Sequence, residues 1–299
     1  MKEGNKVEGA FILTKGAWDD IITLPLGYRR QKPRNAGVTM VIDKGLGYQE
    51  TKDLLDTSGD YIDFLKLGFG TSAFYSKELL LEKIKLAKKY DVEMYPGGTF
   101  LEVAYWQGRI KSFLDRAKEL GFETIEVSDG TITLKPNERK EIIDLALERG
   151  FKVLTEVGKK DAKAKISITN LLEQDQQDLE WGAWKVIMEG RESGKGIGLY
   201  DKEGNVMEDK LEEFISKFSS IENIIWEAPL KNQQVDFITR FGVEVNLGNI
   251  ASNEILALEA LRTGLRGDTL GLVVEYKANK EGFEVPPVLK KLVAAWSLK

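Results

Sequence analysis

From Gly37 onward the chain repeats one pattern: a short apolar or β-branched run, a turn containing Gly or Pro, and a charged stretch with helical spacing. Apolar runs of this kind predict buried strands, and apolar residues three or four positions apart predict helices. In residues 110–120, for example, the apolar positions fall on one helical face and Gly121 follows as a helix stop. The expected strands are Val38–Ile42, Tyr61–Leu67, Val92–Tyr95, Thr124–Val127, Lys152–Val157, Lys185–Met188, Asn223–Trp226 and Val243–Val245.

This alternation of eight strands with eight helical segments predicts a parallel sheet closed on itself, the (β/α)8 TIM barrel. A doubly wound open sheet is the structural alternative, but its usual Gly-rich fingerprint does not follow the first strand here. We expect an N-terminal extension over residues 1–36, a barrel catalytic domain over 37–272, and a C-terminal tail with a short helix over 273–299. The basic patch at residues 29–34 is interpreted as a solvated or subunit-contacting arm rather than a nucleic-acid contact.

The composition narrows the chemistry, because the chain contains neither His nor Cys. This excludes disulfides, thiol nucleophiles, metal sites built from Cys or His, and Ser–His or Cys–His triads. Proton transfer then falls to Lys, Glu, Asp or Tyr, and any metal is a hard, oxygen-liganded ion such as Mg²⁺.

The charge and hydropathy of the chain also limit the classes of partner that it can bind. A net charge of −5 argues against a general nucleic-acid binder, and no apolar stretch is long enough for a transmembrane helix. No signal-peptide core is visible near Met1. We expect a cytoplasmic protein that binds small molecules, with no nucleic-acid or membrane partner. The amphipathic C-terminal segment is compatible with a homo-oligomer.

Acidic residues close four successive strands of the expected barrel. Because active sites of such barrels lie at the carboxyl ends of the strands, these acids should meet at one rim. Converging carboxylates suit a magnesium ion. The alternative for each is a helix cap or an ion pair with a neighbouring Lys or Arg. The predicted metal ligands are Asp129, Glu156, Glu189 and Glu227.

Basic residues follow the same strands and predict a pocket for a small substrate with several negative charges. Strand parity separates two adjacent lysines: Lys160 shares its face with Glu156, whereas Lys159 does not. A desolvated lysine can transfer protons near neutral pH, and a simple anion clamp is the alternative. The predicted catalytic residues are Lys160, Lys159 and Arg191.

The Gly-rich stretch at 190–196 misses the spacing of both the Walker and the dinucleotide motifs. It still offers backbone N–H groups to a phosphate, and the loops after the seventh and eighth strands are the other candidate. The predicted substrate-binding residues are Lys44, Lys66, Ser193, Lys195, Gly196, Lys231, Gly248 and Asn249.

Several blocks, in order along most of the chain, together resemble the phosphosulfolactate synthase family. They are Asp43–Gly45, Gly68–Ser72, Tyr95–Thr99, Glu126–Gly130, Leu154–Lys160, Glu189–Gly196, Trp226–Pro229 and Leu265–Thr269. The resemblance implies a barrel lyase that uses Mg²⁺ and adds sulfite to phosphoenolpyruvate, giving (2R)-phospho-3-sulfolactate. In methane-producing archaea this reaction opens coenzyme M biosynthesis.

The resemblance also implies that the family's catalytic lysine falls on Lys160, which would protonate an enediolate intermediate. Two alternatives remain open at this point. One is a non-catalytic, heat-stress-associated barrel protein of the same superfamily, and the other is a different phosphoenolpyruvate or enolate chemistry at the same site.

Overall fold

The computed structural model describes residues 16–159, 168–218, 221–278 and 285–290, and its centre is an eight-stranded parallel sheet. The sheet order is β3-β2-β1-β8-β7-β6-β5-β4, so the first strand pairs with both the second and the eighth. That pairing is typical of a (β/α)8 TIM barrel and confirms the expected fold class. The strands are β1 Thr39–Asp43, β2 Phe64–Leu67, β3 Glu93–Tyr95, β4 Thr124–Ser128, β5 Lys152–Val157, β6 Lys185–Met188, β7 Ile224–Glu227 and β8 Asn246–Ala251.

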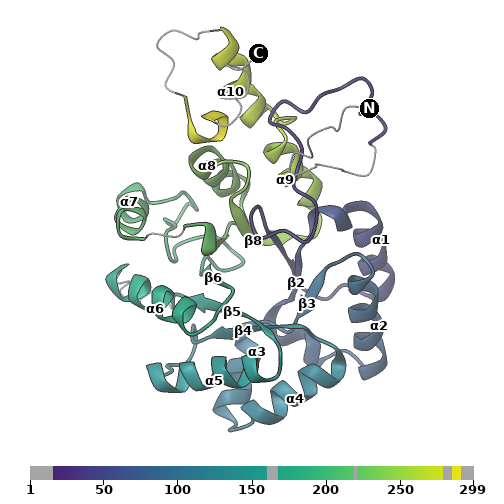
Figure 1. The fold of residues 1–299 in the computed structure, drawn as a ribbon, viewed down its shortest axis with the longest axis vertical. Coiled ribbons are helices and arrows are strands. Elements are labelled where there is room, and N and C mark those ends of the chain that lie inside the picture. The colour runs from purple at the N-terminus through teal and green to yellow at the C-terminus, as the bar shows by residue number, and fades with distance from the viewer. Residues whose placement is uncertain (1–15, 160–167, 219–220, 279–284, 291–299) are drawn as a thin grey trace, which may run out of the picture.

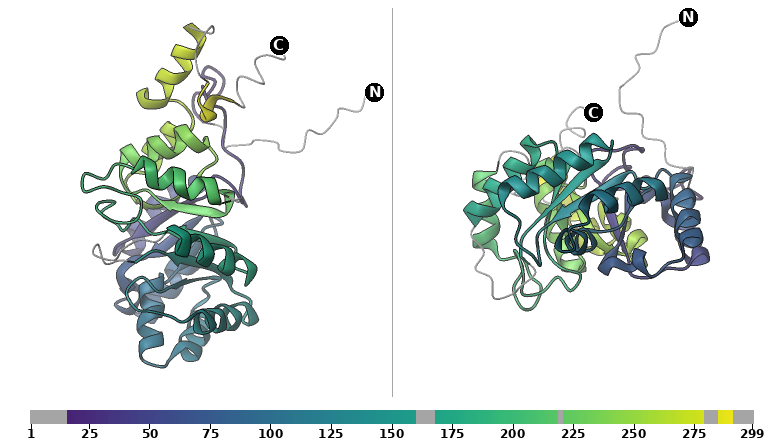
Figure 2. Two further views of the ribbon diagram at one scale, coloured as in Figure 1. Left: turned by 90° about the vertical axis from the view of Figure 1, so that its left-hand side faces the viewer. Right: turned by 90° about the horizontal axis from the view of Figure 1, so that it is seen from below.

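Helices surround the strands on the outside of the barrel (Figures 1 and 2). Gly121, in the left-handed conformation, ends α4 as the sequence predicts, and Gly242 caps α8. Helix α10 projects beyond the barrel, above α8 and α9 in the view of Figure 1. The helices are α1 Tyr48–Ser58, α2 Lys77–Lys88, α3 Gly98–Trp106, α4 Ile110–Leu120, α5 Pro136–Glu148, α6 Ile168–Glu180, α7 Glu208–Lys217, α8 Lys231–Phe241, α9 Ile255–Arg262 and α10 Gly267–Ala278, with short 3₁₀ helices η1 Gly59–Tyr61, η2 Gly68–Ala73 and η3 Ile221–Asn223.

The sequence places seven strands within a few residues, but its eighth strand is wrong. Val243–Val245 precedes β8, which runs over Asn246–Ala251 instead. The alternating valines of the predicted segment have high strand propensity, whereas Asn and Gly within β8 have low propensity. Pairing with β1 and β7 overrides that propensity. As a result, Gly248 and Asn249 lie within a strand and not in a loop after it.

Two apolar cores lie on opposite faces of the strands. The larger fills the space between the sheet and its helices, and the smaller lies inside the barrel and includes Met40, Phe64, Leu154 and Ile187. Side chains alternate between the two faces along each strand. Polar residues two positions beyond the inner core therefore point into the barrel at its carboxyl end.

The barrel has a seam between β3 and β4, because these strands stand at the two ends of the hydrogen-bonded order. Side chains bridge the seam. The Glu126 carboxylate on β4 accepts a hydrogen bond of 2.7 Å from the backbone N–H of Gly98, the first residue of α3. At the other end of the strands, Glu93 of β3 accepts hydrogen bonds from Thr124 and Lys152. Helix α3 thus belongs to the closure of the barrel.

The basic patch near the N-terminus packs against the barrel, so its interpretation as a solvated arm is wrong. Arg29 and Arg34 are buried. Arg29 bonds to the carboxylate of Glu259, and Arg34 makes two bonds to Asp63, at 2.8 and 3.1 Å. Lys32 donates to three backbone carbonyls of the α1–β2 and α2–β3 connections. These contacts fasten the segment to the amino-terminal end of the strands.

The C-terminal region begins within a helix, because α10 runs across residue 272. Beyond it, Val288 and Leu289 are buried. Within the described part of the chain, no helix combines the length and the apolar character needed to cross a membrane.

Candidate active site

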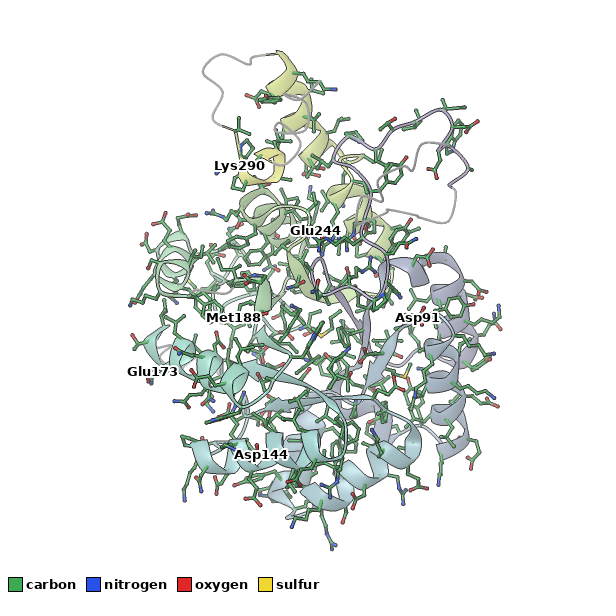
Figure 3. The ribbon with its side chains drawn as sticks, viewed as in Figure 1. Asp91, Asp144, Glu173, Met188, Glu244 and Lys290 are labelled. Atoms are coloured by element: carbon green, nitrogen blue, oxygen red, sulfur yellow. The ribbon has the colours of Figure 1, made fainter. Side chains whose placement is uncertain are left out.

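Four glutamates gather inside the carboxyl end of the barrel. Glu126, Glu156 and Glu227 stand on β4, β5 and β7, and Glu189 directly follows β6. Each is at most 2 % exposed. They share strand parity with residues of the inner core: Glu156 lies two positions after Leu154, and Glu227 two after Ile225. In Figure 3, Met188 labels the end of β6, the strand that Glu189 follows, whereas Asp144 and Glu173 lie on the outer helices α5 and α6.

Lys66 of β2 lies among these glutamates. Its Nζ atom is 3.0 Å from both Glu126 Oε2 and Glu156 Oε2, and 3.4 Å from Glu227 Oε1. Burial by itself lowers the pKa of Lys66, but the three carboxylates outweigh it and hold the pKa well above its usual value. Lys66 is therefore a fixed positive charge at neutral pH. The substrate-binding role of Lys66 stays a prediction.

Three of the four predicted metal ligands come together. Carboxylate oxygens of Glu156, Glu189 and Glu227 lie within 4.8 Å of one another, and all three residues are buried. Three negative charges in a buried site repel one another, and Lys66 offsets one of them. The donor set is entirely oxygen, which suits a hard divalent cation. These residues therefore fit Mg²⁺.

Asp129, the fourth predicted ligand, lies in a different set of contacts. Its carboxylate is 3.3 Å from Nη1 of Arg139 and 2.8 Å from Nζ of Lys159. Lys159 also donates to the carbonyls of Asp129 and Ile132, at 2.6 and 2.9 Å. Its three ammonium protons are thus matched by three acceptors. This geometry makes Lys159 a tether of the β4–α5 loop.

Arg139 connects this loop to the carboxyl end of β5. The guanidinium pairs with both oxygens of Asp178 on α6, at 2.8 and 2.6 Å, and donates to the Glu156 carbonyl at 3.0 Å. Arg139 and Asp178 are both buried. The pair therefore fixes the backbone that presents the Glu156 carboxylate. Lys160, four residues after Glu156, lies outside the described residues.

The β6–α7 loop carries the other predicted anion contacts. Arg191, Ser193 and Lys195 are exposed there, and the backbone N–H of Arg191 donates to Glu189 Oε1 at 2.7 Å. Gly196 and Gly198 have positive φ angles of 64° and 58°. Left-handed residues occur in anion-binding loops, but the N–H of Gly196 itself donates to the Asp201 carbonyl at 2.7 Å.

Three predicted anion contacts outside the β6–α7 loop lie in three different places. Lys44 follows β1 and is 3.5 Å from Glu192 in the β6–α7 loop, so these two loops meet. Lys231 is half exposed and pairs with Asp268 at 2.9 Å, at the start of α8. Gly248 faces the barrel interior, where a Cβ atom would lie 2.4 Å from the Met40 methyl group.

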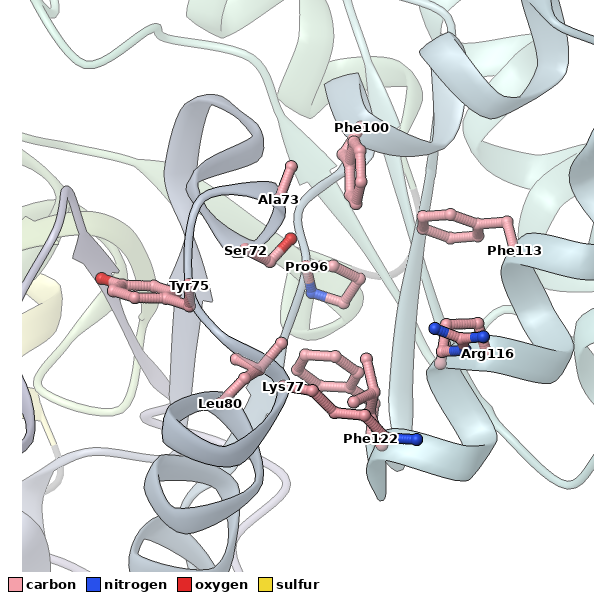
Figure 4. A pocket seen from close by; sticks show the side chains of 12 residues that line it. Ser72, Ala73, Tyr75, Lys77, Leu80, Pro96, Phe100, Phe113, Arg116 and Phe122 are labelled. Carbon is pink, nitrogen blue, oxygen red and sulfur yellow. The ribbon is translucent and has the colours of Figure 1, made fainter.

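A separate apolar pocket of about 250 Å³ lies outside the barrel, between α2 and α4 (Figure 4). Phe100, Phe113 and Phe122 line it, with Lys77 and Arg116 at its edge. None of the glutamates of the barrel mouth is among its lining residues. It is therefore distinct from the candidate active site.

Sequence reasoning missed several polar residues beside the predicted ones. Glu126 closes the seam and pairs with Lys66, and Ser128 Oγ lies 2.8 Å from Glu102 Oε1 and 2.9 Å from Glu156 Oε1. The alternation of Thr124, Glu126 and Ser128 with apolar neighbours was a usable signal, because it places polar residues on one face of the strand. Glu102 and Arg139 lie on helices, where strand parity gives no information.

Comparison with known proteins identifies the family. Residues 27–268 match the model of the ComA family, described as (2R)-phospho-3-sulfolactate synthase. The chain belongs to this family. It is 45% identical to phosphosulfolactate synthase of Methanothermobacter thermautotrophicus over 85% of this chain and 98% of that one. It is 49% identical to phosphosulfolactate synthase of Methanocaldococcus jannaschii over 79% and 95%. Identity to the Arabidopsis thaliana protein HEAT-STRESS-ASSOCIATED 32 is 22%, over 78% and 88%.

As a member of the phosphosulfolactate synthase family, the protein is an enzyme whose substrates are small molecules. The family match spans all eight strands, from the N-terminal segment before β1 to the first residues of α10. The buried glutamates, Lys66 and the Gly-rich loop after β6 all lie within it.

Proposed function

We propose that the protein adds sulfite to phosphoenolpyruvate and forms (2R)-phospho-3-sulfolactate. The observation that carries this proposal is the family match over residues 27–268, which includes every element of the barrel mouth. A buried cluster of carboxylates around a charged lysine supports it, because such clusters destabilise a fold and are typical of functional sites.

The reaction requires stabilisation of negative charge on the substrate. The sulfur lone pair of sulfite forms a bond to C3, and the π electrons of the C2–C3 double bond move to C2 and the adjacent carboxylate. The resulting enediolate then takes one proton at C2. No group leaves, so the step is an addition, and its reverse cleaves a carbon–sulfur bond.

The residues of the barrel mouth suit this charge. Glu156, Glu189 and Glu227 would hold Mg²⁺, which supplies positive charge beside the substrate carboxylate when bound. Lys66 adds a second positive charge. Its contacts to buried carboxylates are already formed, so this charge does not have to be repositioned during the reaction. Burial excludes water from these groups and strengthens their fields.

We assign proton delivery to Lys160, which shares strand parity with Glu156. Lys159 is a weaker candidate because its protons are engaged by the β4–α5 loop. The exposed side chains of Arg191 and Lys195 are our preferred phosphate site. Lys44 reaches the same loop and offsets the repulsion between sulfite and substrate. The phosphate role for Lys231 is less favoured, because that residue pairs with Asp268.

The non-catalytic alternative is less well supported. Identity to the two synthases is about twice that to the heat-stress-associated protein. Several like charges buried together reduce the stability of a fold, so they are not expected in a barrel with a purely structural role. We further propose a cytoplasmic location, in keeping with a chain that lacks Cys.

The experiment is incubation of the purified protein with phosphoenolpyruvate, sulfite and Mg²⁺ in D₂O, followed by mass spectrometry. We expect a sulfonated product carrying one deuteron at C2, and loss of turnover after chelation by EDTA. Lys160→Ala should be inactive and Lys159→Ala only impaired. Absence of product with the wild-type protein would favour the non-catalytic alternative. A product without sulfur would favour another enolate chemistry.

A further inference from the structure

Strand β8 contains one extra residue near the mouth of the barrel. Thr39 of β1 is opposite Leu247, but Val41 is opposite Ile250, so two steps on β1 correspond to three on β8. This is the register of a β-bulge. Asn249 lies in the bulge with a φ angle of 54°. Left-handed backbone is uncommon for residues other than Gly, although Asn tolerates it better than most, and such conformations concentrate at functional sites.

The side chain of Asn249 is buried on the inner side of the barrel. Leu247 and Ile250 belong to the outer core, whereas Gly248 faces Met40 and Glu227 inside. The extra residue between Gly248 and Ile250 therefore continues the inner face. Asn249 is 4 % exposed, and its Oδ1 atom has no hydrogen-bond partner. A buried polar atom left in this state costs about 1–3 kcal/mol.

We propose that Asn249 Oδ1 is a fourth oxygen ligand for the cation held by Glu156, Glu189 and Glu227. On β8, Gly248 is the register partner of Glu227 on β7. Asn249 is the next residue toward the mouth of the barrel, so it lies beside the Glu227 carboxylate. An amide oxygen accepts but cannot donate, so it fits a cation and not a phosphate oxygen. It is also neutral, so it adds an oxygen ligand without adding to the repulsion among the three carboxylates in the absence of the ion.

This assignment refines the predicted substrate-binding role of Asn249, and it rests on the proposed function only for the identity of the cation. The strain and the unpartnered oxygen are both explained by one bound ion. Without it, each remains a separate cost at the same residue.

Thermal unfolding during Mg²⁺ titration, without substrates, tests the proposal. Asn249→Gly keeps the left-handed backbone and removes the oxygen, so the Mg²⁺ concentration at the midpoint of the Tm shift should rise about ten-fold. Asn249→Asp keeps an oxygen and adds a charge, so its midpoint should fall below that of the wild type. Asp91→Gly is the matched control. It relaxes another left-handed residue, in the α2–β3 turn, and should leave the midpoint unchanged.

The proposal is overturned if the wild-type protein shows no Mg²⁺ shift, or if Asn249→Gly keeps the wild-type midpoint. It is also overturned if Asn249→Asp raises the midpoint, or if it leaves the midpoint unchanged while raising KM for phosphoenolpyruvate, the result expected of an anion contact. The titration involves no turnover. A wild-type protein that makes no sulfonate would therefore reject the proposed reaction without affecting this result.

Discussion

Replacement of Lys66 by Met tests whether one charge holds the barrel mouth together. Methionine has a similar length and no charge, so the variant keeps the volume and removes only the ammonium group. Three carboxylate contacts, at 3.0, 3.0 and 3.4 Å, are lost at once. The glutamates that remain are buried.

The magnitude follows from these distances. At an effective dielectric constant of 20, each contact contributes about 5 kcal/mol of attraction, and each pair among Glu156, Glu189 and Glu227, whose oxygens lie within 4.8 Å, repels by at least about 3.5 kcal/mol. The full imbalance is not realised, because a buried carboxylate takes up a proton when its charge becomes too costly. We therefore expect the free energy of unfolding to fall by about 3–5 kcal/mol at pH 7, the usual cost of breaking a buried ion pair.

The dependence on pH gives the prediction its sign. Removal of the ammonium group favours the protonated form of the buried carboxyls around it, so protonation should stabilise the folded variant as the pH falls. The loss relative to the wild type should thus be smaller at pH 5 than at pH 7. In the wild type, the raised pKa of Lys66 contributes stability that is present at neutral pH and lost only at strongly alkaline pH.

Urea unfolding followed by tryptophan fluorescence at both pH values measures these differences. Lys52→Met is the control, because Lys52 forms an exposed pair with Asp56 and its loss should be undetectable. Added Mg²⁺ should stabilise Lys66→Met more than the wild type. A loss below about 1 kcal/mol at pH 7, or one that grows toward pH 5, would refute the electrostatic account.

Three further predictions concern the surroundings of the site. Gly198→Ala should destabilise the fold by about 2–4 kcal/mol in urea unfolding, because a Cβ atom would lie 2.4 Å from a backbone oxygen. Gly196→Ala, with a similar φ and open space, should lose only about 1 kcal/mol, and equal losses would contradict this reading. Arg139→Lys cannot pair with both oxygens of its aspartate partner, so we expect a loss of about 2–4 kcal/mol and a lower kcat, and an unchanged kcat would argue against its effect on β5. Burial lowers the pKa of Lys32 to about 8, so its charge costs stability below that pH and the cost fades between pH 8 and 10.5. The stability of the wild type relative to Lys32→Met should rise over this range, and a flat difference would count against the lowered pKa.

The site could be predicted from the sequence as far as strand parity reaches. Glu156, Glu189 and Glu227 end neighbouring strands with the same phase, so their convergence follows from the barrel itself. Asp129 lies one position out of that phase, and it pairs with Arg139 and Lys159 instead. Contacts between loops and helices depend on tertiary packing, so they cannot be predicted from the spacing of residues along the chain.

The fold could be predicted where propensity and packing agree. Most residues of Lys152–Val157 and Lys185–Met188 are apolar or β-branched, and the structure has the same bounds. In β8, Gly248 and Asn249 disfavour a strand, and only pairing on both sides imposes one. The basic N-terminal segment was predicted to be a solvated arm. That prediction was wrong because acidic residues distant in sequence, such as Glu259, pair with its charges.

Because β3 and β4 are not joined by strand hydrogen bonds, the sheet of the barrel is open at this seam. A proteolytic nick between α4 and β4, at residues 121–123, would sever no strand ladder, and the two fragments could stay associated. At the carboxyl end of the strands, Glu126 bonds to Gly98 with one oxygen and to Lys66 with the other. Together with Glu93 at the amino-terminal end, it holds the seam closed, and it also contributes to the charge balance of the barrel mouth.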